Sequence, residues 1–205
     1  WSGYQELNGG KGQTGLQVTA HETEQLIGLI ENQGIRYVVV RAGPVLPSGE
    51  IARRPGDFFY ELQRRNPDTM YLPWVTGDSE HLNLSSSAWR QAFIDQLEQL
   101  RRQGVRGIHL NIEPVSDSEP GYLDLLHESR LELGPSFFIS HATRSAGLWG
   151  VSFGDLKQYL WSGKFYRSTM AQANQTVVMA YNTRLKQEMA YTAFVEHRTD
   201  LLVDW

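Results

Sequence analysis

The sequence predicts an α/β fold, a (β/α)8 barrel that is incomplete in this chain, with residues 1–205 forming a single domain. Strand-like and helix-like segments alternate, and the strands recur roughly every 32–38 residues, close to the length of one βα unit. Such alternation is typical of a parallel sheet. The competing architecture is an open doubly wound sheet that binds a dinucleotide. It requires a glycine fingerprint after its first strand, and residues 41–49, RAGPVLPSG, do not provide one.

The N-terminal segments establish the alternation. A helix is expected over residues 18–34, because Thr19 provides an N-cap and Gly34 follows the last apolar position. The β-branched run over residues 35–43 then has the length and composition of a strand.

Two helices and a strand follow. Residues 55–67 are expected to form a helix, with one proline near its start and another at its end. Residues 70–77, MYLPWVTG, are a strand candidate that Pro73 weakens, because proline cannot donate to a strand ladder. The clearest helix covers residues 86–104, with a serine cap and a terminal glycine. Its apolar face consists of Trp89, Phe93, Leu97 and Leu100.

The C-terminal half continues the pattern. After a strand within residues 104–115, the expected elements are a helix within 119–133, a strand over 136–143, short helices in the insertion 144–174, a strand over 175–182 and a helix over 185–205. A further strand would end at the N-terminal tripeptide WSG. A complete barrel typically needs about 250 residues, and the chain stops on a helix before a seventh or eighth strand. We therefore expect part of a barrel.

Composition argues against several classes of function. The formal charge of −4 and the absence of a Lys/Arg cluster disfavour a nucleic-acid partner. No apolar run approaches the length of a membrane-spanning helix. The chain has no cysteine, which excludes disulfides and thiolate metal sites but leaves the redox compartment open. It begins at Trp1, so a targeting segment can lie outside it. Oligomeric state does not follow from these properties.

Polar and apolar residues alternate along residues 104–115, GVRGIHLNIEPV. In a barrel, alternate side chains of a strand point inward and the others pack against the outer helices. The residues expected to face the helices are Ile108, Leu110 and Ile112. The residues expected to face the interior, and to rise towards the C-terminal mouth where barrel active sites lie, are His109, Asn111 and Glu113.

Glu113 is the candidate catalytic group. Partial desolvation favours the protonated carboxyl, which can then protonate a leaving group, and Asn111 lies beside it on the same face. The competing structural interpretation is an ion pair between Glu113 and Arg41, at the end of another strand. Arg41 and His109 are also candidate substrate contacts, although His109 is more simply a hydrogen-bonded interior residue. A metal site is not favoured, because adjacent inward positions of one strand seldom converge.

The segment RGIHLNIEP resembles the fourth-strand motif of glycoside hydrolase family 18, the chitinases and related endo-β-N-acetylglucosaminidases. That motif is Asp-Gly-x-Asp-x-Asp-x-Glu, with the glutamate as acid/base. Gly107 and Glu113 match it. The three aspartate positions hold Arg106, His109 and Asn111. The Asn-x-Glu pair is more similar to family 85 endo-β-N-acetylglucosaminidases, and this resemblance implies that Asn111 orients the substrate's N-acetyl group while Glu113 protonates the glycosidic oxygen.

A second segment, VVMAYNT, resembles the sixth strand of family 18, which ends in Met-x-Tyr-Asp or Met-x-Tyr-Asn. The resemblance implies that Tyr181 hydrogen-bonds the acetamido oxygen and that Asn182 contacts the sugar at the cleavage site. The alternative is an ordinary turn at a strand end. One carboxylate can suffice when the substrate's acetamido group participates, and the amide of Asn111 can both donate and accept hydrogen bonds.

The remaining candidates are isolated residues. A tryptophan ring can stack on a sugar, but it can also pack in the hydrophobic core. The candidates for sugar stacking are Trp74, Trp149 and Trp161. His141 ends its strand at the expected mouth and is a candidate substrate contact. Asp117 and Glu119, in the loop after Glu113, are candidate second carboxylates, although loop acids are commonly solvated.

We therefore expect a glycoside hydrolase that cleaves β-linked N-acetylhexosamine glycans, of the chitin, peptidoglycan or N-glycan type, by substrate-assisted retaining hydrolysis. The resemblance implies an oligosaccharide or polysaccharide partner, no cofactor, and a secreted or cell-surface location. Two alternatives stay open. One is a catalytically silent barrel that binds glycans, since aspartate positions of the motif hold His109 and Asn111. The other is a barrel hydrolase that uses two carboxylates.

Overall fold

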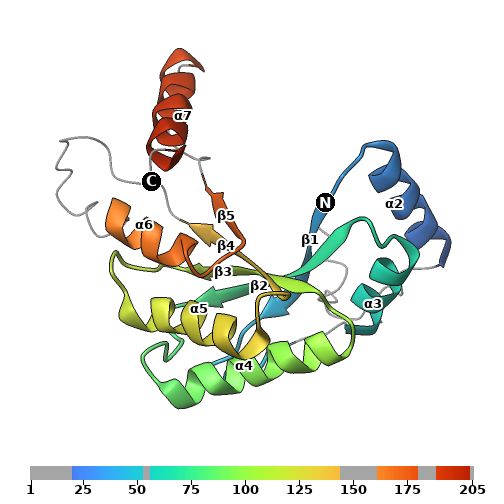
Figure 1. Ribbon diagram of the computed structural model, residues 1–205, viewed down its shortest axis with the longest axis horizontal. Helices are drawn as coiled ribbons and strands as arrows, with labels where there is room; N and C mark the ends of the chain where they lie inside the picture. The colour runs from blue at the N-terminus through green and yellow to red at the C-terminus, as the bar shows by residue number, and fades with distance from the viewer. Residues whose placement is uncertain (1–19, 53–55, 144–160, 180–187, 204–205) are drawn as a thin grey trace, which may run out of the picture.

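The computed structural model describes residues 20–52, 56–143, 161–179 and 188–203. Within them, five parallel strands pair in chain order, from β1 to β5 (Figure 1). The strands are β1 (Tyr37–Pro44), β2 (Met70–Asp78), β3 (Gly107–Glu113), β4 (Phe138–Thr143) and β5 (Gln175–Val178). Each strand pairs with its predecessor, whereas the strand order of a doubly wound sheet reverses at a switch point. The described sheet is therefore part of a (β/α)8-type barrel wall, which confirms the predicted fold class.

Helices follow the strands as predicted. They are α2 (Ala20–Asn32), α3 (Gly56–Arg65), α4 (Ser87–Arg102), α5 (Pro120–Leu133), α6 (Gly163–Met170) and α7 (Glu188–Val203). Helices α4 and α5 lie side by side on one face of the sheet, and α7 extends away from it (Figure 1). The strand expected to end at WSG and most of the insertion before α6 lie outside the described residues. No helix in the described part of the chain is long and apolar enough to cross a membrane.

Local sequence explains where the elements begin and end. Ser86 caps α4 by accepting a hydrogen bond from the amide of Trp89. Gly104 follows α4 with a φ of 88°, a conformation that glycine adopts without strain. Pro73, expected to weaken its strand, lies inside β2 opposite Val40 of β1, so the strand persists despite the missing donor.

The convex face of the sheet forms the core with the helices. The apolar residues of β3 that were expected to face outward are all buried and belong to this core, namely Ile108, Leu110 and Ile112. Phe93 and Leu97 of α4 and Leu125 of α5 join them there. The prediction that every second residue of β3 packs towards the helices is therefore confirmed for its three apolar residues.

A contact across the concave face shows how strongly the sheet curves. The ring centroids of Tyr37 on β1 and Phe138 on β4 lie 5.4 Å apart, although β2 and β3 run between these strands. In a flat sheet, three strand spacings would separate them by about 14 Å. Gly107 of β3 makes room, because a Cβ there would lie 2.7 Å from the Phe138 Cβ and 2.8 Å from Leu72 Cδ2. The polar side chains of β3 thus project into a concave interior.

Candidate functional site

The strand register arranges the inward side chains in layers. The lowest polar layer crosses all five strands and consists of Arg41, Trp74, His109, Ser140 and Gln175. The next layer towards the carboxyl ends pairs Thr76 with Asn111, and the layer above it pairs Asp78 with Glu113. The predicted inward stripe of β3 therefore leads from a floor at His109 to the end of the strand at Glu113.

His109 is part of a hydrogen-bonded row in the floor layer. Ser140 donates its hydroxyl proton to Gln175 Oε1 at 2.8 Å, and His109 Nδ1 lies 2.8 Å from the same hydroxyl oxygen. Since the hydroxyl has one proton, Nδ1 carries the imidazole proton and Nε2 keeps its lone pair. Burial lowers the pKa of His109 to about 4, so the ring is neutral at pH 7. The interpretation of His109 as a hydrogen-bonded interior histidine fits this geometry.

Trp74 and Arg41 are neighbours of His109 in the floor. The indole of Trp74 meets the imidazole edge to face, with ring centroids 6.3 Å apart. Its Nε1 is buried and has no hydrogen-bond partner among the described residues. Arg41 lies opposite Trp74, whereas Glu113 lies opposite Asp78, four residues further along β2. No ion pair joins Arg41 to Glu113, so the expected structural alternative for Glu113 is wrong.

Glu113 and Asn111 are both half-buried on the inward face of β3. Within residues 20–52, 56–143, 161–179 and 188–203, the Glu113 carboxylate makes no ion pair and no side-chain hydrogen bond. The Oδ1 atom of Asn111 is buried and accepts no hydrogen bond from the same residues. A buried acceptor without a partner costs free energy, so an amide N–H of a ligand over β3 would find a favourable acceptor here.

Asp78 is the neighbouring carboxylate that sequence patterns did not reveal. It lies opposite Glu113, but its own loop engages both oxygens: Oδ1 accepts from the Glu80 amide at 3.0 Å and Oδ2 lies 2.8 Å from His81 Nδ1. The hydrogen bond from His81, followed by that from the Glu80 amide, lowers the pKa of Asp78. This carboxylate is therefore ionised and directed at residues 79–81.

The two loop acids expected as second carboxylates also bind main chain. Asp117 Oδ1 accepts a hydrogen bond from the Ser162 amide at 2.7 Å. Glu119 caps α5 by accepting from the Gly121 amide at 3.3 Å. Both carboxylates thus stabilise the loop that follows β3, which is a structural use of their charge.

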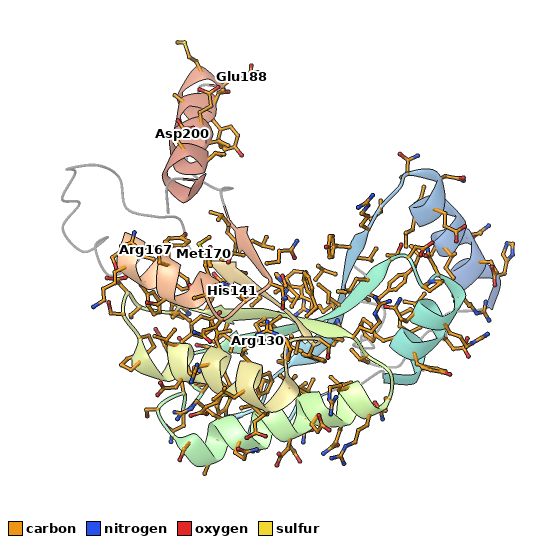
Figure 2. All side chains as sticks on the ribbon, in the orientation of Figure 1. Arg130, His141, Arg167, Met170, Glu188 and Asp200 are labelled. Carbon is orange, nitrogen blue, oxygen red and sulfur yellow. The ribbon has the colours of Figure 1, made fainter. Side chains whose placement is uncertain are left out.

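The expectation that His141 lies at the mouth is wrong. His141 is opposite Leu110 of β3, so it faces the helices and is fully buried, on β4 beside α6 (Figure 2). Its Nδ1 lies 3.2 Å from the Tyr122 hydroxyl and its Nε2 lies 3.0 Å from Thr176 Oγ1. Burial lowers its pKa to about 3. The inward positions of β4 are those in phase with Ser140, which pairs with His109 of the floor.

Trp161 is likewise in the core and not at a sugar-binding surface. Only 2% of its surface is exposed, and its indole N–H donates to the Val115 carbonyl at 2.9 Å. The other expected contacts, Trp149, Tyr181 and Asn182, lie outside the described residues. Among the residues that are described, no group of three or more His, Asp and Glu side chains could hold a metal ion.

Solved structures with a similar fold include two chitinases and a spore cortex-lytic enzyme. The chitinase of Chromobacterium violaceum ATCC 12472 is similar, with a TM-score of 0.67 and 14% identity, over 91% of this chain and 62% of that one. The Bacillus cereus spore cortex-lytic enzyme SleL is similar, with a TM-score of 0.66 and 12% identity, over 92% of this chain and 46% of that one. A chitinase from Bacteroides thetaiotaomicron has a TM-score of 0.60 and 14% identity, over 82% of this chain and 53% of that one.

These similarities establish the fold. They agree with the expected barrel, and the chain spans less than two thirds of the length of each of these three structures. No protein-family model matches the sequence, and no curated protein matches it.

Proposed function

We propose that this chain is part of a glycoside hydrolase that cleaves β-linked N-acetylhexosamine glycans, with Glu113 as the acid/base. The position of Glu113 carries the proposal. It is an inward carboxylate at the carboxyl end of a barrel strand, where barrel active sites lie. Its carboxyl group makes no ion pair and no side-chain hydrogen bond with the described residues, so a glycosidic oxygen can approach it.

The reaction needs only one carboxyl group from the protein. Glu113 donates its proton to the glycosidic oxygen as the bond to the anomeric carbon breaks, and the carbonyl oxygen of the 2-acetamido group bonds to that carbon. The resulting oxazolinium ion is opened by water, which gives its proton to the Glu113 carboxylate, so the anomeric configuration is retained. The participating acetamido group replaces a second carboxylate.

Asn111 orients the acetamido group in this mechanism. Its buried Oδ1 accepts the acetamido N–H, which pre-positions the carbonyl oxygen for attack. Trp74, Arg41 and His109 form the floor below this position. Tyr181 and Asn182 complete the subsite in the proposal, on the basis of the sequence resemblance alone.

The chemistry proposed for the site supports this substrate class, which also agrees with the names of the similar structures. Those names describe chitinases and a spore cortex-lytic enzyme. Chitin-type and peptidoglycan-type glycans both present the 2-acetamido group that the mechanism requires. A secreted or cell-surface location agrees with such substrates.

Hydrolysis of chitooligosaccharides and peptidoglycan by the full chain and by Glu113→Gln tests the proposal. Glu113→Gln keeps the size of the side chain but removes the proton donor, so we expect turnover to fall by about 10²–10⁴-fold. Glu80→Gln, which changes a neighbouring loop acid, is the matched control and keeps wild-type turnover. Equal activity of Glu113→Gln and the wild type would remove Glu113 from the mechanism.

A glycan-binding barrel without turnover is the second candidate, because His109 and Asn111 leave β3 with a single carboxylate. Calorimetric titration with the same oligosaccharides distinguishes it. Binding by the wild type with no turnover, at an affinity that Glu113→Gln leaves unchanged, would favour this candidate over the hydrolase.

A further inference from the structure

Three consecutive carbonyl groups, starting at Glu113, accept hydrogen bonds from distant parts of the chain. Ser79, which directly follows β2, donates its amide N–H to the Glu113 oxygen at 3.1 Å and its hydroxyl to the Pro114 oxygen. Trp161, which precedes α6, donates its indole N–H to the Val115 oxygen at 2.9 Å. The main chain from Glu113 to Val115 is thus held from both sides.

Trp161 is itself firmly placed. Its indole contacts four aromatic rings at centroid distances of 4.6–6.3 Å, those of Tyr122, His141, Phe165 and Tyr166. A second hydrogen bond joins the same two segments, from the Ser162 amide to Asp117 Oδ1 at 2.7 Å. The start of α6 is therefore a rigid support for the loop that follows β3.

These bonds restrict the direction in which the Glu113 side chain leaves the main chain. Fixed carbonyl directions restrict the dihedral angles of Glu113 and Pro114, and these angles set the Cα–Cβ direction of Glu113. The Cα–Cβ direction sets where the Glu113 side chain starts, and its χ angles then place the carboxylate, which no ion pair or side-chain hydrogen bond from the described residues holds. A misplacement of about 1 Å can cost about 10²-fold in rate.

We propose that Ser79 and Trp161 are positioning residues that aim the Glu113 carboxyl by holding the main chain after β3. This inference rests on the proposed function of Glu113. Neither residue contacts substrate: Trp161 acts from the core, and Ser79 acts through carbonyl oxygens.

Trp161→Phe in the full chain is the first test. It removes the indole N–H and keeps an aromatic ring in the core. Trp89→Phe is the matched control, because Trp89 also donates its indole N–H to a carbonyl, that of Leu46 at 3.4 Å, and stacks on Phe93. We expect Trp161→Phe to lower kcat by about 10-fold or more, with KM within about 2-fold of the wild type. Trp89→Phe keeps both constants.

Ser79 provides an independent test with a rescue. Ser79→Ala removes the hydroxyl, and we expect it to lower kcat as Trp161→Phe does. Ser79→Thr keeps a hydroxyl, and we expect it to have the kcat of the wild type. Wild-type kcat in Trp161→Phe and Ser79→Ala would overturn the inference, as would a loss of thermal stability without a change in kcat.

A measurement without turnover separates this inference from the proposed function. The ¹³Cδ chemical shift of Glu113 reports the surroundings of its carboxyl group. We expect it to change in Trp161→Phe and not in Trp89→Phe, and equal shifts in both would overturn the positioning role. A wild-type chain that cleaves no acetamido glycan would overturn the proposed function, and the chemical shift would still decide whether Trp161 positions Glu113.

Discussion

Asp78 and Glu113 lie opposite each other at the carboxyl ends of β2 and β3, yet among the described residues only the Asp78 carboxylate has hydrogen-bond partners. This difference separates a mechanism with one carboxylate from one with two. In a two-carboxylate glycosidase, the second group must face the substrate to act as nucleophile or base. The Asp78 oxygens are instead engaged by His81 and the Glu80 amide.

Asp78→Asn therefore separates the two mechanisms. The asparagine can still accept a hydrogen bond from the Glu80 amide, so we expect turnover of chitooligosaccharides within a few-fold of the wild type. A fall comparable to that of Glu113→Gln would instead assign Asp78 a catalytic role and contradict acetamido participation. Steady-state kinetics of both variants on one substrate provide the comparison.

Asn111→Leu is expected to reduce the preference for N-acetylated substrates. Leucine has a similar size but no acceptor for the acetamido N–H, and losing one such hydrogen bond in a buried site costs about 1–3 kcal/mol, or roughly 5–150-fold in kcat/KM. The measurement compares kcat/KM on acetylated and partly deacetylated oligosaccharides. An unchanged ratio would exclude Asn111 from recognition of the acetamido group. Thr76→Val, on the neighbouring strand in the same layer, is the control.

Acid is expected to destabilise the fold through two buried histidines. Burial lowers the pKa of His109 to about 4 and that of His141 to about 3, whereas the unfolded chain has histidines with a pKa of about 6.5. Above pH 6.5 both histidines are neutral in the folded and in the unfolded chain, so their protonation does not reduce the free energy of unfolding. As the pH falls from 6.5 towards the folded values, the unfolded state binds protons first, and each histidine reduces the free energy of unfolding by about 1.4 kcal/mol per pH unit.

Urea unfolding of the wild type and of His141→Phe between pH 7 and pH 5 measures this effect. The variant cannot take up the proton at position 141, so its free energy of unfolding should depend less steeply on pH. His21→Gln changes an exposed histidine of α2 and should keep the wild-type slope. Parallel pH profiles for His141→Phe and the wild type would contradict the assignment of the slope to His141.

Arg90 is expected to be a stability determinant between α4 and α5. Its Nε and terminal nitrogen donate to the two carboxylate oxygens of Glu128 at 2.8 and 2.7 Å, and its other terminal nitrogen donates to the Leu84 carbonyl at 2.9 Å. Arg90→Lys keeps the charge but loses this planar arrangement. We expect a loss of about 1–3 kcal/mol in the free energy of unfolding.

Thermal and urea unfolding of Arg90→Lys measure this loss, and Arg101→Lys is the control variant. Arg101 makes a similar bidentate pair with Glu98, but on the solvent-exposed side of α4. Exposed pairs contribute little, so this control should unfold like the wild type. Equal stability of both variants would show that the Arg90 pair also contributes little.

Most elements were predictable because each depends on neighbours along the chain. The inward stripe of β3 follows from an alternation of polar and apolar residues within one strand. The strand that contains His141 lacks such an alternation: its residues after Phe138 are all buried. Which of them face the helices is decided only by pairing, which places His141 opposite Leu110.

The sequence by itself determined the order of strands and helices, the inward direction of His109, Asn111 and Glu113, and hence the candidate acid. Tertiary structure alone decided that Arg41 lies in a lower layer than Glu113 and that Asp78 is the residue opposite Glu113. It also brought Ser79 and Trp161 to the carbonyl groups after β3. The physical reason is distance along the chain: periodicity acts over a few residues, whereas strand register and helix packing join residues tens of positions apart.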